Sequence, residues 1–209
     1  MPYEIRQYNF EIRTRENDGI GILSGKPVVY NSRTNLGEFD EIIMPGALDE
    51  TDLKDVRFLV NHDTKMIPLA RSRRNNGNST MTLKVTDQGL ELEEARLDIR
   101  NNTTAAALYS AVSRGDISGM SFMFVIDGEE WEDLETDHPL RKITKIATLI
   151  EISAVMFPAY EDTDINARSK AALESARSAL EKARRQRANA VETAGRELEL
   201  LKLRTRRLI

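Results

Sequence analysis

Three polar residues of this sequence lie in segments that otherwise have the pattern of buried β-strands: His62, Ser121 and Glu151. A serine hydroxyl can attack a carbonyl when a histidine accepts its proton, and a carboxylate can hold the imidazole in the required orientation. The three side chains therefore supply a nucleophile, a base and an orienting acid, each from a separate segment. Because these residue types are common, the trio alone indicates a candidate serine hydrolase and no more.

His62 follows a segment with strand periodicity. Alternation places it on the same side as Val56, Phe58 and Val60, so its ring points inward or lies at the edge of the core. The alternative is a core-edge histidine that hydrogen-bonds a backbone carbonyl, and this segment alone favours that alternative. The other histidine, His138, lies in an acidic loop and is expected to be solvated.

Ser121 lies in the apolar strand pattern 117–126. Gly119 is on the same face, which leaves room for another backbone to approach the hydroxyl, as acyl transfer requires. Ser118 is on the opposite face, so Ser121 is the favoured nucleophile. The alternative is a small strand residue that hydrogen-bonds locally, which is the commoner role of a lone serine in a strand.

Glu151 and Ser153 interrupt the segment 149–157, which is apolar on both faces and so predicts a fully buried strand. Burying a carboxylate costs several kcal/mol unless it is paired, so Glu151 needs a hydrogen-bonding partner. One interpretation is a carboxylate that orients the histidine ring. The other is a structural ion pair with a buried arginine, for which the candidates are Arg71, Arg114 and Arg141.

The composition excludes several kinds of chemistry. The 209 residues include no cysteine and two histidines, which excludes disulfides, thiol nucleophiles and zinc–thiolate sites. No His-x-x-x-His or paired-carboxylate spacing supports a metal-dependent hydrolase, so we expect no metal and no other cofactor. No segment approaches the roughly 18 consecutive apolar residues of a membrane span, and the N-terminus has no export pattern, so we expect a soluble, unexported protein without a membrane partner.

Charge divides the chain into an acidic body and a basic tail. Residues 169–209 contain 11 Lys and Arg against 5 Asp and Glu, which leaves 19 basic and 29 acidic residues for 1–168. A net charge of −10 on the body argues against nucleic acid as its main ligand, because phosphate contacts need a surplus of basic side chains. The basic residues of the tail lie among Ala and Glu, which favours a solvated helix face.

The body, residues 1–165, is predicted to be mainly β. A turn signal at 86–89 predicts a hairpin, 102–113 predicts a short helix that ends at Gly115, and 127–139 reads as an acidic loop. These elements fit a mostly antiparallel barrel or sandwich with one or two helices. Strand patterns occur at residues 4–13, 21–30, 55–61, 80–85, 89–97, 117–126, 141–148 and 149–157.

The tail, residues 166–209, is predicted to be a long helix. Its apolar residues recur at helical spacing but are rich in alanine and form no sustained heptad, so such a stripe binds weakly when alone. Three arrangements remain open: the helix packs on the body, pairs with another helix, or stays a partly ordered extension.

Four blocks of the body, spread over about residues 21–163, resemble the prohead maturation proteases of tailed bacteriophages of the HK97 type. The blocks are residues 37–48, Asn61-His62-Asp63, Arg114-Gly115-Asp116-Ile117-Ser118-Gly119-Met120-Ser121-Phe122, and residues 149–160. Their order and spacing are far more specific than any single block.

The resemblance implies a fold similar to herpesvirus assemblin, a β-barrel with flanking helices, and a serine endopeptidase in which His62 acts with Ser121. Glu151 is our candidate for the third member, and oxyanion donors would come from backbone amides or from Arg71 or Arg114. The implied substrate is the scaffolding segment of the major capsid protein inside the assembling prohead, in the host cell cytoplasm, together with the protease itself.

The basic tail is a candidate for a removable or scaffold-binding helix, since its charge suits acidic helical scaffolds. The major capsid protein is the expected partner, and self-association of the chain is a further candidate. A rival from another class is a non-catalytic capsid scaffold or assembly protein that kept the fold and lost the reaction. A histidine ring close to the Ser121 hydroxyl supports the enzyme, and wide separation supports the rival.

Overall fold

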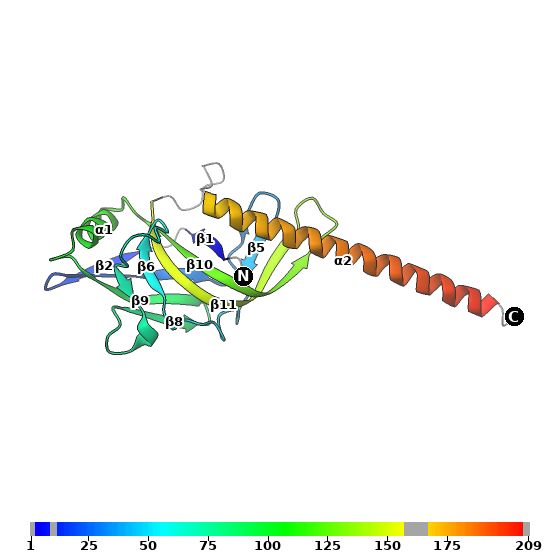
Figure 1. Ribbon diagram of the computed structural model, residues 1–209, viewed down its shortest axis with the longest axis horizontal. Helices are drawn as coiled ribbons and strands as arrows, with labels where there is room; N and C mark the ends of the chain where they lie inside the picture. Colours follow the sequence, from blue (N-terminus) through cyan, green and yellow to red (C-terminus); the bar gives the residue numbers. More distant parts are fainter. Residues whose placement is uncertain (1–2, 9–11, 157–166, 207–209) are drawn as a thin grey trace.

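The computed structural model describes residues 3–8, 12–156 and 167–206. The described chain is mainly β, with two sheets, a short helix and one long C-terminal helix that extends beyond the body (Figure 1). The mainly β prediction with flanking helices is confirmed. The described strands form two sheets, and closure into a barrel remains a prediction.

The larger sheet is organised around one long strand, β11. This strand runs antiparallel to β10 and parallel to both β5 and β6, which pair with its first and its last part respectively. The main path is β1-β10-β11-β5-β4, and β6 continues to β7. The strands are β1 (Glu4–Tyr8), β4 (Thr34–Asn35), β5 (Asp40–Ile43), β6 (Arg57–Val60), β7 (Ala70–Arg71), β10 (Gly119–Glu132) and β11 (Leu140–Val155).

The smaller sheet has the order β2-β3-β9-β8, and all of its pairs are antiparallel. The hairpin predicted around 86–89 is confirmed as β8 and β9. A short 3-10 helix, Arg73–Asn75, precedes it. The four strands are β2 (Arg13–Asn17), β3 (Ile20–Val29), β8 (Met81–Thr86) and β9 (Gly89–Asp98).

The region predicted as an acidic loop at 127–139 followed by two strands forms one long hairpin, in which only residues 133–139 are a loop. β10 continues to Glu132, and a single strand, β11, covers both predicted strands. The acidic residues did not prevent pairing because basic residues lie beside them on the partner strand: Lys142 contacts Glu132, and Arg141 contacts Glu129. Four register shifts between Met123 and Glu129 bend the hairpin.

Helix α1 (Thr103–Arg114) is confirmed with the termini that its sequence predicts. The Asn102 side chain accepts hydrogen bonds from the backbone amides of Thr104 and Ala105, which caps the first turn. Gly115 ends the helix in the left-handed conformation at φ 80°.

The main core lies between the two sheets, and the side chains on one face of β10 are buried in it. Met120, Phe122 and Phe124 are fully buried in it, and Ile152 joins them from β11. Alternation therefore places Ser121, with the neighbouring residues at odd positions of β10, on the other face of the larger sheet.

Helix α2 (Ala167–Arg206) packs on the body with its first half. Ala176 and Leu180 are buried against Phe39, with Trp131 and Leu134 beside them. Arg184 donates hydrogen bonds to the carbonyl oxygens of Leu134 and Thr136. The proposed domain boundary near residue 165 lies outside the described residues.

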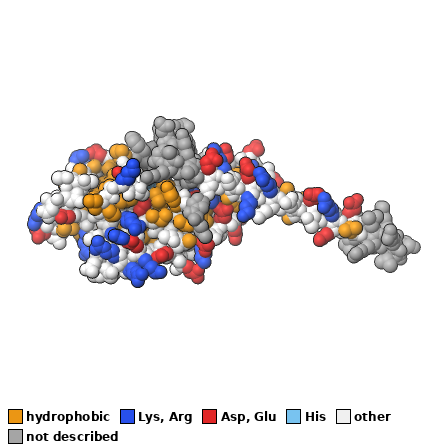
Figure 2. Space-filling model, in the orientation of Figure 1, with side chains coloured by type: hydrophobic (Ala, Val, Ile, Leu, Met, Phe, Trp, Pro, Cys, Tyr) orange, Lys and Arg blue, Asp and Glu red, His pale blue; other side chains and the backbone are white. Residues whose placement is uncertain are grey.

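The second half of α2 leaves the body and carries exposed apolar side chains. Val191, Leu198 and Leu200 are more than half exposed. Charged side chains of both signs accompany them along this extension (Figure 2). The first half of α2 therefore packs on the body, and the second half extends beyond it.

A buried ion cluster ties β1 to the rest of the larger sheet. Arg6 donates to Glu41 and Glu4, with 2.6 Å from its Nη2 to Glu41 Oε2. Arg141 donates to Glu4 Oε2 at 2.9 Å and to Glu41 Oε2 at 3.1 Å, and it contacts Glu129 at the rim. Burial raises the pKa of Glu4, but the charges and hydrogen bonds of Arg6 and Arg141 outweigh burial, so that its pKa lies below the usual 4.5.

This cluster predicts a pH-dependent stability. We expect Arg141→Met to lower the free energy of unfolding by about 3–5 kcal/mol at about pH 7, because it leaves the buried carboxylates of Glu4 and Glu41 with the single charge of Arg6. Because the folded-state pKa of Glu4 is depressed, its stabilising effect is present above about pH 4.5 and is lost as the pH falls, so the cost of Arg141→Met should shrink in acid.

Urea unfolding at about pH 7 and about pH 4 measures this effect. Arg100→Met is the matched control, since Arg100 pairs with Asp18 on the surface and should contribute less than about 1 kcal/mol. An Arg141→Met cost that is small at neutral pH, or equal at both pH values, would contradict the prediction.

Candidate active site

His62 lies directly after β6, in a turn that the neighbouring strand holds in place. Asn61 and His62 both have left-handed backbones, with φ of 48° and 56°. The Asn61 amide donates to the Ala154 carbonyl at 3.0 Å, and its side-chain oxygen accepts from the Met156 amide at 3.2 Å. Left-handed non-glycine residues are strained, so the contacts with β11 determine where the His62 ring lies.

The ring of His62 pairs with Glu151. The distance between His62 Nδ1 and Glu151 Oε1 is 2.5 Å, and both side chains are almost completely buried. Parallel pairing of β6 with β11 brings the two segments side by side, and the turn at Asn61 and His62 carries the ring toward Glu151, 89 positions away in the chain. A carboxylate on Nδ1 fixes the ring and leaves Nε2 as the nitrogen that can accept a proton.

Ser153 completes this arrangement. Its hydroxyl donates to Glu151 Oε2 at 2.6 Å and accepts from the His62 backbone amide at 3.0 Å. The sequence shows Ser153 as a polar residue that interrupts an apolar strand on the same face as Glu151. This position is a signal for a buried hydrogen-bonding role, but the sequence does not identify the partners, which are Glu151 and the His62 amide.

Ser121 lies on the same sheet face, directly opposite Ser153 in the antiparallel pair of β10 and β11. Opposite residues of such a pair point to one side of the sheet, with Cβ atoms about 4.5–5.5 Å apart. The Ser121 side chain is fully buried, and its Oγ donates to the Arg6 carbonyl in β1 at 2.7 Å. Ser118, the disfavoured serine, is exposed.

The contacts of Glu151 and His62 differ from the non-catalytic roles that the sequence also allowed. Glu151 bonds to His62 and Ser153, whereas each arginine candidate has other acidic partners: Asp55 for Arg71, Asp116 for Arg114, and the ion cluster for Arg141. The His62 ring contacts a carboxylate, where the alternative expected a backbone carbonyl. The Ser121 hydroxyl bonds to the Arg6 carbonyl, 115 positions away in the chain, and not locally as its alternative expected.

The two arginines that we considered as oxyanion donors each form an ion pair with an aspartate. Arg71 Nη2 lies 2.7 Å from Asp55 Oδ2, and hydrogen bonding to Asp55 raises the pKa of Arg71. Arg114, at the exposed end of α1, lies 2.6 Å from Asp116 Oδ2. Either arginine would have to leave its acid to reach a substrate.

His138 differs from the expectation of a solvated side chain. Its Nε2 lies 2.8 Å from Asp40 Oδ1, and the ring is only partly exposed. Burial raises the pKa of Asp40, but hydrogen bonds from His138 and Arg33 outweigh burial and lower it. The acidic loop folds back on β5, which sequence periodicity does not reveal.

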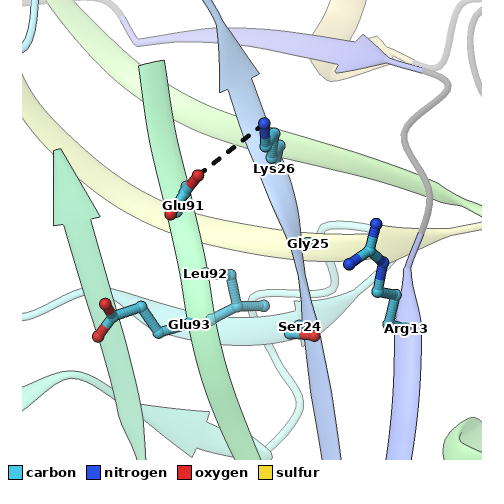
Figure 3. A pocket seen from close by; sticks show the side chains of 7 residues that line it. All are labelled: Arg13, Ser24, Gly25, Lys26, Glu91, Leu92 and Glu93. Atoms are coloured by element: carbon cyan, nitrogen blue, oxygen red, sulfur yellow. Dashed lines mark ion pairs between the residues drawn. The ribbon is translucent and has the colours of Figure 1, made fainter. Parts of the chain in front are cut away.

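Other kinds of site receive no support from the described residues. They contain no group of His, Asp and Glu arranged to hold a metal ion, and none of their helices is long and apolar enough to cross a membrane. A pocket on the smaller sheet is lined by residues of β2, β3 and β9, among them Arg13, Lys26 and Glu91 (Figure 3). Lys26 Nζ and Glu91 Oε1 are 3.9 Å apart there.

The comparison with known families decides the identity. The family model of the caudovirus prohead serine proteases matches residues 8–177, which is most of the chain. The chain belongs to this family. Members are serine proteases with a role in phage capsid maturation, so the resemblance seen in the four sequence blocks is confirmed. Searches of curated proteins and of solved structures gave no match.

Membership in a prohead protease family gives the buried site a chemical context. A phage capsid is the implied partner, and the assembling capsid is where such a protease acts. The matched range includes His62, Ser121 and Glu151, together with β6, β10 and β11.

Proposed function

We propose that this chain is a serine endopeptidase in which Ser121 is the nucleophile, His62 the general base and Glu151 the residue that orients the ring. The observation that carries the proposal is the 2.5 Å contact between His62 Nδ1 and Glu151 Oε1, beside a serine on the same sheet face. A fully buried histidine–carboxylate pair next to a serine is the arrangement that activates a hydroxyl.

The reaction would follow from these roles. The Ser121 Oγ attacks the scissile carbonyl carbon while His62 Nε2 takes the hydroxyl proton, and the ring then protonates the leaving amine. Water repeats the sequence on the acyl-enzyme and releases the second product. Glu151 stabilises the ring when it is charged. Backbone amides are the favoured oxyanion donors, because Arg71 and Arg114 are each paired with an acid.

The proposed substrate is the scaffolding segment of the major capsid protein, with the protease chain itself as a second substrate. The family's role in capsid maturation supports this choice. The half of α2 that leaves the body is proposed to bind the scaffold, since it offers exposed apolar side chains on a tail whose net charge over 169–209 is +6 (11 basic and 5 acidic residues). A partner helix with an acidic face would complement it.

Co-expression with the cognate capsid protein tests the function. We expect capsid fragments whose new N-termini lie in the scaffolding segment, identified by N-terminal sequencing, and a shortened protease chain. The rival interpretation, a non-catalytic assembly protein, predicts shells that contain the intact chain and uncleaved capsid protein. Loss of the chain from the shells when it is ended at Arg187 would support scaffold binding by the distal half of α2.

A further inference from the structure

Ser153 stands at the centre of a closed set of hydrogen bonds. Its hydroxyl donates a hydrogen bond to Glu151 Oε2 and accepts one from the His62 backbone amide. The other carboxylate oxygen of Glu151 contacts His62 Nδ1. The side chain is fully buried. One hydroxyl therefore fixes both the orientation of the carboxylate and the backbone that carries the histidine.

We propose that Ser153 is a positioning residue for the reaction of Ser121, an inference that rests on the proposed function. Without its hydroxyl, one oxygen of Glu151 and the amide of His62 would each lose a buried partner. The left-handed backbone at His62 would lose one of the contacts that maintain it. The ring would then be held less well relative to the nucleophile, where a shift of about 1 Å can cost about 100-fold in rate.

The test compares Ser153→Ala with Ser153→Thr, which restores a hydroxyl. We expect kcat to fall about 100-fold in the alanine variant with little change in KM, and to recover largely in the threonine variant. Ser72→Ala is the matched control, because Ser72 is also buried and also bridges two backbone groups, the Val56 amide and the Leu53 carbonyl. Its kcat should stay within about twofold of wild type.

A second readout is the NMR resonance of the proton on His62 Nδ1. We expect this resonance to move in Ser153→Ala and to keep its position in Ser153→Thr and Ser72→Ala. An unchanged resonance or an unchanged kcat in Ser153→Ala would overturn the inference. Absence of cleavage by the wild-type chain would contradict the proposed function instead, and the resonance would still test the positioning of the ring.

A different observation carries a second inference, which concerns β1. A hydroxyl has one proton, and the Ser121 hydroxyl gives it to the Arg6 carbonyl at 2.7 Å. While this bond exists, Ser121 cannot donate to His62, as the proposed reaction requires. The nucleophile is also fully buried, so a substrate carbonyl cannot reach it in this arrangement.

β1 is well placed to maintain this state. It pairs with β10 over five residues, and Gln7 lies opposite Ser121. On the other face, the ion cluster of Glu4 and Arg6 fastens the same strand to Glu41 and Arg141. We infer that β1 is an autoinhibitory strap, and that its displacement from β10 frees the Ser121 hydroxyl and opens the site.

Labelling by diisopropyl fluorophosphate tests the strap, with the labelled residue located by peptide mass spectrometry. Gln7→Pro should loosen β1, seen as faster amide exchange there, and raise the rate of labelling at Ser121 at least about tenfold. Thr14→Pro, in the exposed edge strand β2, is the control and should label at the wild-type rate. Equal labelling of Gln7→Pro and wild type, with β1 exchanging fast in the variant, would overturn the inference.

A covalent lock gives the opposite test. Ile5 and Met123 are paired across β1 and β10, and the chain has no cysteine, so Ile5→Cys combined with Met123→Cys gives a single disulfide candidate. Once mass spectrometry has verified the bond, labelling of Ser121 should be slower than in wild type, and a reductant should restore it. Fast labelling of the locked chain would overturn the strap. No labelling in any variant would contradict both the strap and Ser121 as nucleophile.

Discussion

Replacing Ser121 with alanine should abolish cleavage of the scaffolding segment and of the chain itself. Loss of the nucleophile of a serine protease lowers kcat by roughly 10⁴- to 10⁶-fold, so intact capsid protein should persist through the co-expression experiment. The substitution removes one oxygen and one hydrogen bond, to the Arg6 carbonyl, and leaves the paired strands β10 and β11 in place. The measurement is the rate at which capsid fragments appear, with the amount of folded protease held equal.

Ser118→Ala is the matched control for this experiment. Ser118 lies three residues away on the exposed surface, so its variant should cleave at the wild-type rate. If Ser121→Ala still cleaved at more than about a tenth of the wild-type rate, Ser121 would not be the nucleophile.

Glu151→Gln should have the second largest effect, a fall in kcat of about 10³- to 10⁴-fold with little change in KM. Glutamine has nearly the shape of glutamate, so the pocket stays filled. Its neutral amide can no longer stabilise a charged ring, and if its nitrogen faces His62 Nδ1 it holds the ring in the wrong tautomer. Steady-state kinetics on a peptide from the scaffolding segment measure the effect.

Glu41→Gln separates this role from the general cost of losing a buried carboxylate. Glu41 is equally buried but belongs to the ion cluster with Arg6 and Arg141. We expect this variant to be less stable without any loss of kcat per folded molecule, because a loosened β1 can only favour the free Ser121 hydroxyl. Equal losses of kcat in both glutamine variants would show that Glu151 acts only through stability.

The pairing of His62 with Glu151 could be predicted only in part from the sequence. Burial of Glu151 could be predicted from the apolar strand around it, and with it the need for a partner. Which partner it meets could not be predicted, because three arginines suited it as well as a histidine did. The parallel pairing of β6 with β11 decides the matter, and a contact across 89 positions leaves no trace in local periodicity.

For the fold as well, features set by neighbouring residues could be predicted, and features set by distant residues could not. The hairpin of β8 and β9 and the caps of α1 depend on a turn and on end residues that stand next to each other in the sequence, and both were predicted. β2 was missed because all five of its side chains are exposed, so it shows no alternation. The bonding of Ser121 to Arg6 was missed because backbone carbonyls carry no sequence signal.

The long hairpin shows where composition misleads. The acidic segment 127–139 predicted a loop, since charge usually marks solvated turns. Cross-strand ion pairs, such as that between Lys142 and Glu132, allow strand pairing to continue instead.

We propose that a serine and a carboxylate from two strands, and a histidine from the turn after a third strand, act on one carbonyl. The most direct measurement of this proposal is the site of covalent labelling by diisopropyl fluorophosphate, under conditions in which the chain cleaves its substrate. We expect one label, on Ser121, which is lost in His62→Ala. A label on Ser153 or another serine, or labelling of Ser121 that does not depend on His62, would contradict it.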